Sequence, residues 1–213
     1  MLVSRLRLHF MFAALIILIM GTVWAIGEPT AALDRLSLVS AYLFLMLISY
    51  VLLIGPLQTM RTGRVAINHI LRRDVAIWGG IVGLVHLVAG SAESMTPVYL
   101  DVFINHASNP PSFKIRESLF FWSAIIGFII GPLLIILLAL SNNWSLALMG
   151  QKWWKRLHRI SYLIFVLTVL HGFGFQVLES RGWAGYGLLG SMAIIVCTTQ
   201  VFGFRVIVGR PER

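Results

Sequence analysis

Long runs of apolar residues alternate with short polar segments along almost the whole chain. Each run spans about 17–25 residues, the length that an α-helix needs to cross the hydrocarbon core of a bilayer. The pattern therefore predicts an all-α polytopic membrane protein, built as a six-transmembrane-helix bundle with the lipid bilayer as its surroundings. We place the six spans near Phe10–Ile26, Leu38–Leu57, Val75–Ala92, Leu119–Leu140, Ile160–Val177 and Tyr186–Ile207.

These spans leave no segment long enough for a Rossmann-type nucleotide domain or a soluble catalytic domain, so we expect a single domain over residues 1–213. Composition agrees, because 58% of the residues are hydrophobic, 12% are charged and the mean hydropathy is +0.87. Soluble domains carry about 25% charged residues, and a soluble chain of this size cannot bury so much apolar surface. An ordinary soluble enzyme and a disordered chain are both excluded. The one cysteine, Cys197, excludes an internal disulfide and a cysteine-only metal cluster.

The formal net charge of +9 comes from basic residues that gather in the polar segments between the spans. In a soluble protein this excess would point to nucleic acid. Here it is a topology signal, because cytoplasmic loops of membrane proteins are enriched in Lys and Arg. Thirteen of the 17 Lys and Arg residues fall on one side of the predicted bundle and four on the other. We therefore expect both termini in the cytoplasm and no nucleic-acid partner.

The polar connections carry loop-forming residues. The longest connection, Glu93–Ser118, contains three prolines and lies on the predicted non-cytoplasmic side. A loop of this length is either a docking surface or a simple tether. The pairs Gly55-Pro56 and Gly131-Pro132 predict helix kinks or helix ends in the second and fourth spans.

Very few ionisable residues lie at membrane depth, where they are costly enough to suggest a function. His86 and His171 each lie 11 residues past the predicted start of the third and fifth spans, which cross the membrane in the same direction. The two histidines should thus share one level in the outer half of the membrane. By the same count, Arg72 and His158 share a level at its cytoplasmic edge.

Two imidazoles that face each other across a helix bundle can form the axial ligand pair of a six-coordinate b-type haem. The alternative for each histidine is a hydrogen bond between helices, with no cofactor. His158 precedes His171 by 13 residues, which is about 20 Å of helix and leaves room for a second redox centre. On an ideal helix 13 residues rotate by about 220°. Either the helix is distorted near Gly172 and Gly174, or the two sites are approached from different sides.

Several segments resemble the ferric reductase-like transmembrane domain superfamily. GQKWWKRLHRISYLIFVLTVLHGF (Gly150–Phe173) is similar to its fifth-span signature, and RRDVAIWGGIVGLVHL (Arg72–Leu87) is similar to its third-span motif. LLIGPL (Leu52–Leu57) and LLALSNN (Leu137–Asn143) fit the same pattern. Within the superfamily, the chain resembles in particular the haem-binding membrane subunits of bacterial methionine sulfoxide reductase systems.

The resemblance implies an electron-transfer subunit of an oxidoreductase in the bacterial inner membrane, with one or two b-type haems. Electrons would enter on the cytoplasmic side from a flavin reductase, from bound FMN or FAD, or from quinone. They would leave to an extracytoplasmic redox partner protein of the methionine sulfoxide reductase type, or else to ferric iron.

The same resemblance implies roles for four residues. His86 and His171 match the outer haem pair, and His158 matches one ligand of the inner haem. Arg72 stands where related oxidases have the inner histidine of the third span. Because arginine is a poor iron ligand, Arg72 either holds a haem propionate, ligates in an unusual way or anchors the helix end.

A non-redox membrane protein is the rival hypothesis. In a small transporter or an assembly factor, the same histidines would serve proton relay or helix packing. The remaining histidines are predicted to lie away from any cofactor, His9 at the membrane interface and His69 and His106 in solvated loops. Trp78 is predicted to belong to an interfacial aromatic belt.

Overall fold

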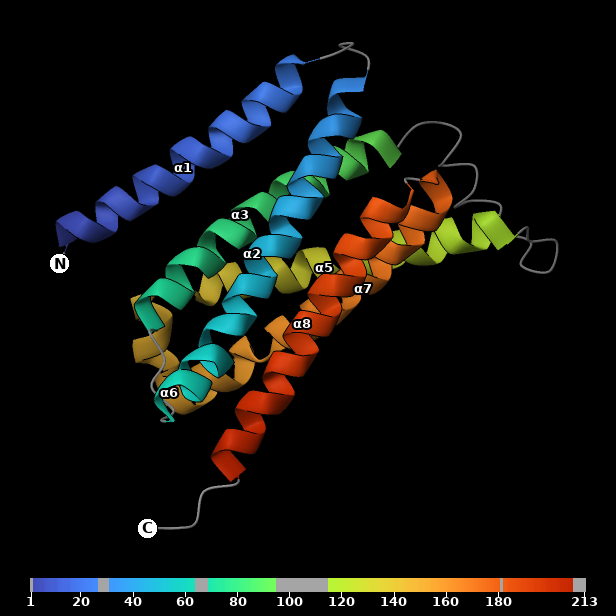
Figure 1. Cartoon of the computed structure of the whole chain (residues 1–213). Helices are drawn as coiled ribbons and strands as arrows, with labels where there is room; N and C mark the ends of the chain where they lie inside the picture. Colours follow the sequence, from blue (N-terminus) through green and yellow to red (C-terminus); the bar gives the residue numbers. More distant parts are fainter. Residues whose placement is uncertain (1, 27–30, 64–68, 95–114, 181, 209–213) are drawn as a thin grey trace.

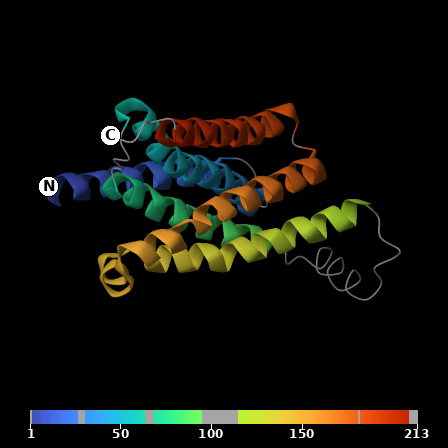
Figure 2. The same ribbon diagram turned by 90° about the horizontal axis from the view of Figure 1, so that it is seen from below.

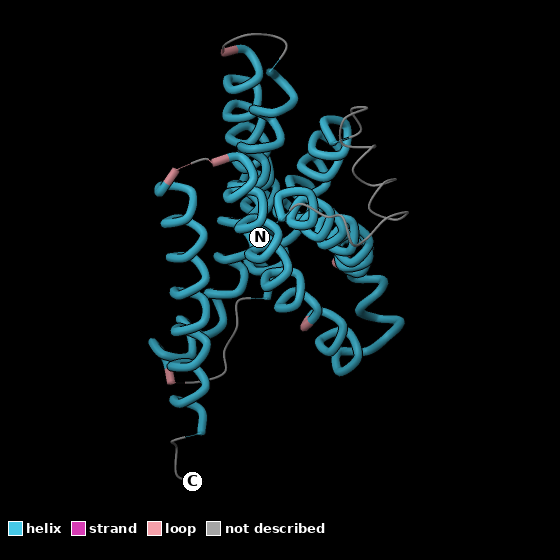
Figure 3. Tube along the Cα trace, turned by 90° about the vertical axis from the view of Figure 1, so that its right-hand side faces the viewer, coloured by secondary structure: helices cyan, strands magenta, loops and turns pink. Residues whose placement is uncertain are grey.

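The computed structural model describes residues 2–26, 31–63, 69–94, 115–180 and 182–208. The regular elements of these ranges are helices, with no strand among them (Figure 3). They are α1 (Leu2–Ala25), α2 (Ala32–Thr62), α3 (His69–Ser94), α5 (Ile115–Leu140), α6 (Asn143–His158), α7 (Ile160–Glu179) and α8 (Trp183–Val208). Within the same ranges, six helical segments are long and apolar enough to cross a membrane, with α6 and α7 counted as one segment. The prediction of an all-α membrane protein with six spans is confirmed.

Most helices extend beyond the predicted spans. α2, for example, begins six residues before and ends five residues after the predicted Leu38–Leu57. The apolar run marks only the part of a helix that crosses hydrocarbon, whereas backbone hydrogen bonding continues into the polar residues beyond it. The helix α6 had no counterpart among the predicted spans, because it is short and its last turn is basic.

The helices run up and down beside one another (Figures 1 and 2). The start of α1, the end of α8 and the helix α6 lie at one end of the bundle, which we call the α6 end (Figure 2). The end of α7 and the start of α8 lie at the opposite end (Figure 2). Helix direction places ten described basic residues toward the α6 end: Arg5, Arg7, Arg61, Arg72, Arg73, Lys152, Lys155, Arg156, Arg159 and Arg205. That this end faces the cytoplasm stays a prediction from the positive-inside rule.

α2 is the central helix and packs against α1, α3, α7 and α8. Pro56 lies inside α2 and does not end it. Because proline has no N–H, the carbonyl of Leu52 one turn earlier loses its helical donor. The amide of Gln200 on α8 donates to that carbonyl at 2.8 Å. A Cβ on Gly203 of α8 would come within 2.8 Å of the Pro56 Cβ, so this glycine lets α8 approach the proline closely.

α1 lies at the edge of the bundle, and most of its apolar side chains are exposed, as expected of a helix that faces lipid. Its anchor to α3 is polar, because the Arg5 guanidinium donates to both carboxylate oxygens of Asp74, which is fully buried. The indole N–H of Trp78 donates to Nδ1 of His9 at 3.0 Å, so the proton of this imidazole is on Nε2, 3.7 Å from Asp74. His9 and Trp78, predicted as interfacial residues, thus take part in an inter-helix network.

His158 and His171 lie on two consecutive helices that together form one membrane-spanning segment. α6 ends at His158, α7 begins at Ile160, and Arg159 forms a turn between them. α7 continues without interruption through Gly172 and Gly174. The alternative of a distortion at these two glycines is therefore wrong. The non-helical backbone in this part of the chain is at Gly150 within α6 (φ 72°, ψ 160°), whereas Arg159 keeps helical dihedral angles (φ −66°, ψ −18°).

The hydrophobic core lies where α2, α3 and α7 meet. Leu45, Leu52, Val82 and Ile164 are each at most 2% exposed there. Two cavities interrupt this core, and the four candidate site residues line them.

Candidate functional site

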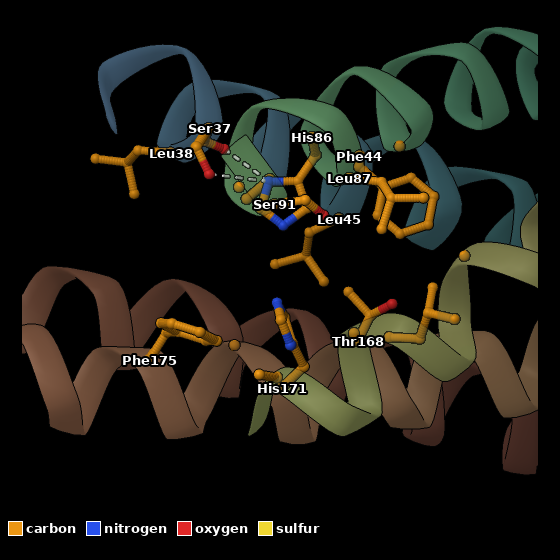
Figure 4. A pocket seen from close by; sticks show the side chains of 18 of the residues that line it. Ser37, Leu38, Phe44, Leu45, His86, Leu87, Ser91, Thr168, His171 and Phe175 are labelled. Atoms are coloured by element: carbon orange, nitrogen blue, oxygen red, sulfur yellow. Dashed lines mark hydrogen bonds between the residues drawn. The ribbon is translucent and has the colours of Figure 1, made fainter. Parts of the chain in front are cut away.

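The first cavity lies between α2, α3, α5 and α7, toward the end opposite α6. We call it the two-histidine cavity, because His86 of α3 and His171 of α7 face each other across it (Figure 4). Its lining near the two rings is mainly apolar and includes Phe44, Leu45 and Leu87. The polar lining residues are Ser37, Tyr42, Ser91, Glu93, Thr168, Gln176 and Glu179.

The two imidazole rings are close and differently oriented. Their centroids are 5.9 Å apart and their planes cross at 79°. In Figure 4, one nitrogen of each ring points toward the other ring. The structure therefore brings together the two histidines whose depth along the sequence matched.

Each ring is held from behind by a backbone carbonyl. Nδ1 of His86 lies 2.9 Å from the carbonyl oxygen of Ser37 on α2, and Nδ1 of His171 lies 2.8 Å from that of Ser123 on α5. A carbonyl oxygen only accepts, so both Nδ1 atoms must be the donors. In the neutral imidazole, Nε2 then carries a lone pair and no proton. Metal-binding histidines show this arrangement, in which the second-shell hydrogen bond fixes the tautomer and the ring orientation.

A glycine on α5 makes room for the His171 ring. A Cβ on Gly127 would lie 2.8 Å from Cε1 and 3.1 Å from Nδ1 of that ring. Ser123 and Gly127 are four residues apart and thus lie on one face of α5. This face supplies both the carbonyl that holds the ring and the recess that receives it.

Two buried polar atoms in the lining lack a partner among the described residues. They are the hydroxyl of Thr168 and Oε1 of Gln176, and these side chains are only 9% and 4% exposed. The other end of the Gln176 amide donates to the Tyr42 hydroxyl at 2.8 Å, which joins α7 to α2. A buried polar group without a hydrogen bond costs about 1–3 kcal/mol. An occupant with polar substituents would offset part of that cost.

The spacing of the rings suits a metal ion between them. First-row metals lie about 2 Å from an imidazole nitrogen. Two axial nitrogens are then about 4 Å apart, and their ring centres, each about 1 Å further out, are about 6 Å apart. The observed 5.9 Å between centroids agrees with that value. The donor set therefore fits a bis-imidazole metal centre.

The volume of the cavity sets a condition on any large ligand. The cavity measures about 170 Å³, which is below the about 300–1,000 Å³ of ordinary ligand pockets. A porphyrin between the rings therefore requires the leucine side chains of the lining, Leu45, Leu87 and Leu134, to turn aside. Leucine side chains can do this by changing rotamer, whereas backbone at the same place could not.

The second cavity measures about 330 Å³ and lies nearer the α6 end. We call it the cationic cavity, because Arg72, Arg73, Lys155 and Arg159 line it together with His158. The predicted shared level of Arg72 and His158 agrees with their place in one cavity. No second imidazole lines it among the residues that the structure describes.

His158 has its own set of contacts. Its Nδ1 donates to the carbonyl of Trp154 at 2.9 Å, and the Trp154 ring stacks on the imidazole with centroids 3.8 Å apart. Nε2 faces the Ser141 hydroxyl at 3.4 Å. Phe44 and Leu134 line both cavities, so the wall between the two is thin and apolar.

The predicted site residues thus fall into two groups, His86 with His171 and His158 with Arg72. The side chain of His69, the whole of His106 and most of the Glu93–Ser118 connection lie outside the described residues. The sequence interpretation missed the contributions of Ser37, Ser123 and Gly127. The small residues Ser123, Gly127 and Gly131 recur every fourth position on α5, which is a signal of close approach between membrane helices.

No family model matches this chain, and no solved structure matches it. The resemblance to the ferric reductase-like domain therefore stays a prediction from its motifs.

Proposed function

We propose that the chain is a b-type haem-binding transmembrane electron-transfer protein, with His86 and His171 as the axial ligands. One observation carries the proposal. Two imidazoles face each other with centroids 5.9 Å apart, and each is fixed by a backbone carbonyl at Nδ1. With Nδ1 as the donor, Nε2 of each neutral ring carries the lone pair that binds a metal.

Two protein ligands suit a macrocycle better than a free metal ion. Closed metal sites in proteins usually have four or more protein ligands. In the described ranges, no group of three or more His, Cys, Asp or Glu side chains comes together. A haem brings four equatorial nitrogens of its own and needs only the two axial donors, which is what the two-histidine cavity offers.

The residues of the cavity would hold the haem and shield it from water. His86 and His171 bind and orient the group, and the apolar lining keeps water away from it and keeps the local dielectric low. The haem supplies one-electron redox chemistry when bound. A haem held by His86 and His171 would lie within the membrane, where it could take part in electron transfer across the bilayer.

The cationic cavity supports a second cofactor site. Its four Lys and Arg side chains are suited to the propionates of a second haem or to the phosphate of FMN or FAD. With a second haem, His158 would supply one axial ligand and Arg72 would contact a propionate. This assignment rests on the charge of the lining and on a single imidazole.

The direction of transfer follows from the predicted topology. Electrons enter at the α6 end, on the cytoplasmic side, from a flavin, a flavin reductase or quinone. They leave from the two-histidine cavity to an acceptor outside the cytoplasm, either a methionine sulfoxide reductase-type protein or ferric iron. A bacterial inner membrane is the setting that this scheme requires.

Absorption spectroscopy tests the proposal. Protein purified in detergent from haem-replete cells should be red, with a Soret band that shifts on reduction by dithionite. A colourless preparation, correctly inserted and still helical by circular dichroism, would contradict it. That result would favour a transporter or an assembly factor with packing histidines.

A further inference from the structure

The angle between the two imidazole planes carries a second inference, which rests on the proposed function. The planes of His86 and His171 cross at 79°, close to perpendicular. When two imidazoles bind one iron from opposite sides, each ring interacts by π overlap with the iron orbital perpendicular to its plane. Parallel rings act on the same orbital and separate the energies of the two π-type orbitals, whereas perpendicular rings leave them nearly equal. The angle is thus a property that the protein can set.

The rings are held in these orientations by different helices. Nδ1 of His86 is tied to Ser37 on α2, with the carbonyl at 2.9 Å and the hydroxyl at 3.5 Å. Nδ1 of His171 is tied to Ser123 on α5 at 2.8 Å. A ring with Nε2 on a metal and Nδ1 on a fixed carbonyl has little freedom to turn about its long axis. Because the two carbonyls belong to separate helices, the bundle itself defines the angle.

Side-chain packing adds to the control on the His171 side. Phe175, one turn along α7, lies 4.9 Å from the His171 ring and is tilted by 54° to it. Gly127 lies against the Cε1–Nδ1 edge of the ring, where a Cβ would approach Cε1 to 2.8 Å. His171 is thus bounded by a phenyl ring and by the backbone of α5, so a larger residue at position 127 must rotate it.

We propose that Ser37, Ser123 and Gly127 hold the two axial imidazoles nearly perpendicular and thereby set the electronic character of the bound iron. In this account Gly127 is a positioning residue, which acts through its contact with the His171 ring. The oxidised, low-spin iron should then give the highly anisotropic electron paramagnetic resonance spectrum of perpendicular imidazoles. Parallel imidazoles give instead a rhombic spectrum with three well-resolved features.

The test is the spectrum of the oxidised, purified protein at low temperature. The wild type should show the highly anisotropic signal. Gly127→Ala should shift the largest g value downward as the His171 ring turns. The matched control is Gly187→Ala on α8, where an added Cβ meets nothing within 4 Å, and its spectrum should equal that of the wild type.

The outcomes separate the two proposals. A protein without a Soret band overturns the proposed function. A protein that binds haem but shows a rhombic spectrum overturns the perpendicular arrangement and leaves haem binding intact. A Gly127→Ala spectrum identical to that of the wild type overturns the positioning role.

A second variant covers the case in which Gly127→Ala fails to bind haem. Phe175→Leu removes the other boundary of the His171 ring and introduces no clash. Its largest g value should move or broaden while haem content is kept, and an unchanged spectrum contradicts control of the angle by packing.

Discussion

The two cavities are built largely by the same helices but differ in the polar groups that they present. The two-histidine cavity presents two neutral imidazoles, each tied to a carbonyl of another helix. The cationic cavity presents one imidazole, tied to a carbonyl of its own helix, and four Lys and Arg side chains. Phe44 and Leu134 separate them.

The difference follows from depth in the bundle. Charges are expensive within hydrocarbon but tolerable at helix ends, so the cations gather at the α6 end. In the two-histidine cavity both imidazoles are hydrogen-bonded to backbone carbonyls, and the two acids of its lining, Glu93 and Glu179, lie near the ends of α3 and α7. This difference in polar groups agrees with the proposal of a metal with two imidazole ligands in one cavity and an anionic group in the other.

The largest expected effect is the loss of haem from the two-histidine cavity. His86→Ala and His171→Ala each remove one of two axial donors, so each should abolish the two-histidine centre while the helices still insert. Haem per polypeptide, measured as the pyridine haemochrome, checks this. Normal haem content in either variant would refute the pairing.

A smaller effect is expected at the other imidazole. His158→Ala should keep the haem of His86 and His171, and it should lower total haem only by the share held in the cationic cavity. Haem stoichiometry and the reduced-minus-oxidised spectrum report the result. If all haem disappeared, the two cavities would not be independent sites.

Loss of one cation should weaken anion binding in the cationic cavity. Arg72→Gln removes a charge-assisted contact, so affinity for FMN should fall roughly tenfold, or about 1.4 kcal/mol. Quenching of FMN fluorescence measures it. Arg205→Gln is the control, because Arg205 is an exposed cation at the same end that does not line the cavity. If both substitutions lowered the affinity for FMN equally, the cavity would contribute no more to FMN binding than the general positive charge of this end.

The smallest effect on the two cavities is expected for a charge whose role is structural. Asp74→Asn weakens the anchor to Arg5 and should cost about 1–2 kcal/mol, less than the about 3–5 kcal/mol of a fully buried pair, because Arg5 is 35% exposed. The melting temperature should fall by a few degrees with haem spectra unchanged. A changed Soret band would mean that the α1–α3 network also supports the site.

Much of this arrangement could be predicted from the sequence because helix geometry is regular. A fixed rise per residue made His86 and His171 equal in depth, and the structure does bring their rings together. The kink at Gly150 was not predictable from periodicity, because a single glycine within a helical pattern does not by itself mark a change of direction.

Other features depend on contacts between distant parts of the chain. The carbonyls of Ser37 and Ser123 belong to the backbone, which every residue has, so no side-chain pattern marks them. Trp78 donates a hydrogen bond to His9, and Arg5 donates one to Asp74; in each pair the two residues are 69 positions apart in the sequence. Such pairs follow from how α1 and α3 pack, which a hydropathy pattern does not determine.

The most direct test of the central claim is the identity of the axial ligands. Near-infrared magnetic circular dichroism of the oxidised protein distinguishes ligand pairs by the energy of a charge-transfer band. The account predicts the band of bis-imidazole ligation, lost in His86→Ala and in His171→Ala. A band from any other ligand pair, or a bis-imidazole band that survives in either variant, would contradict it.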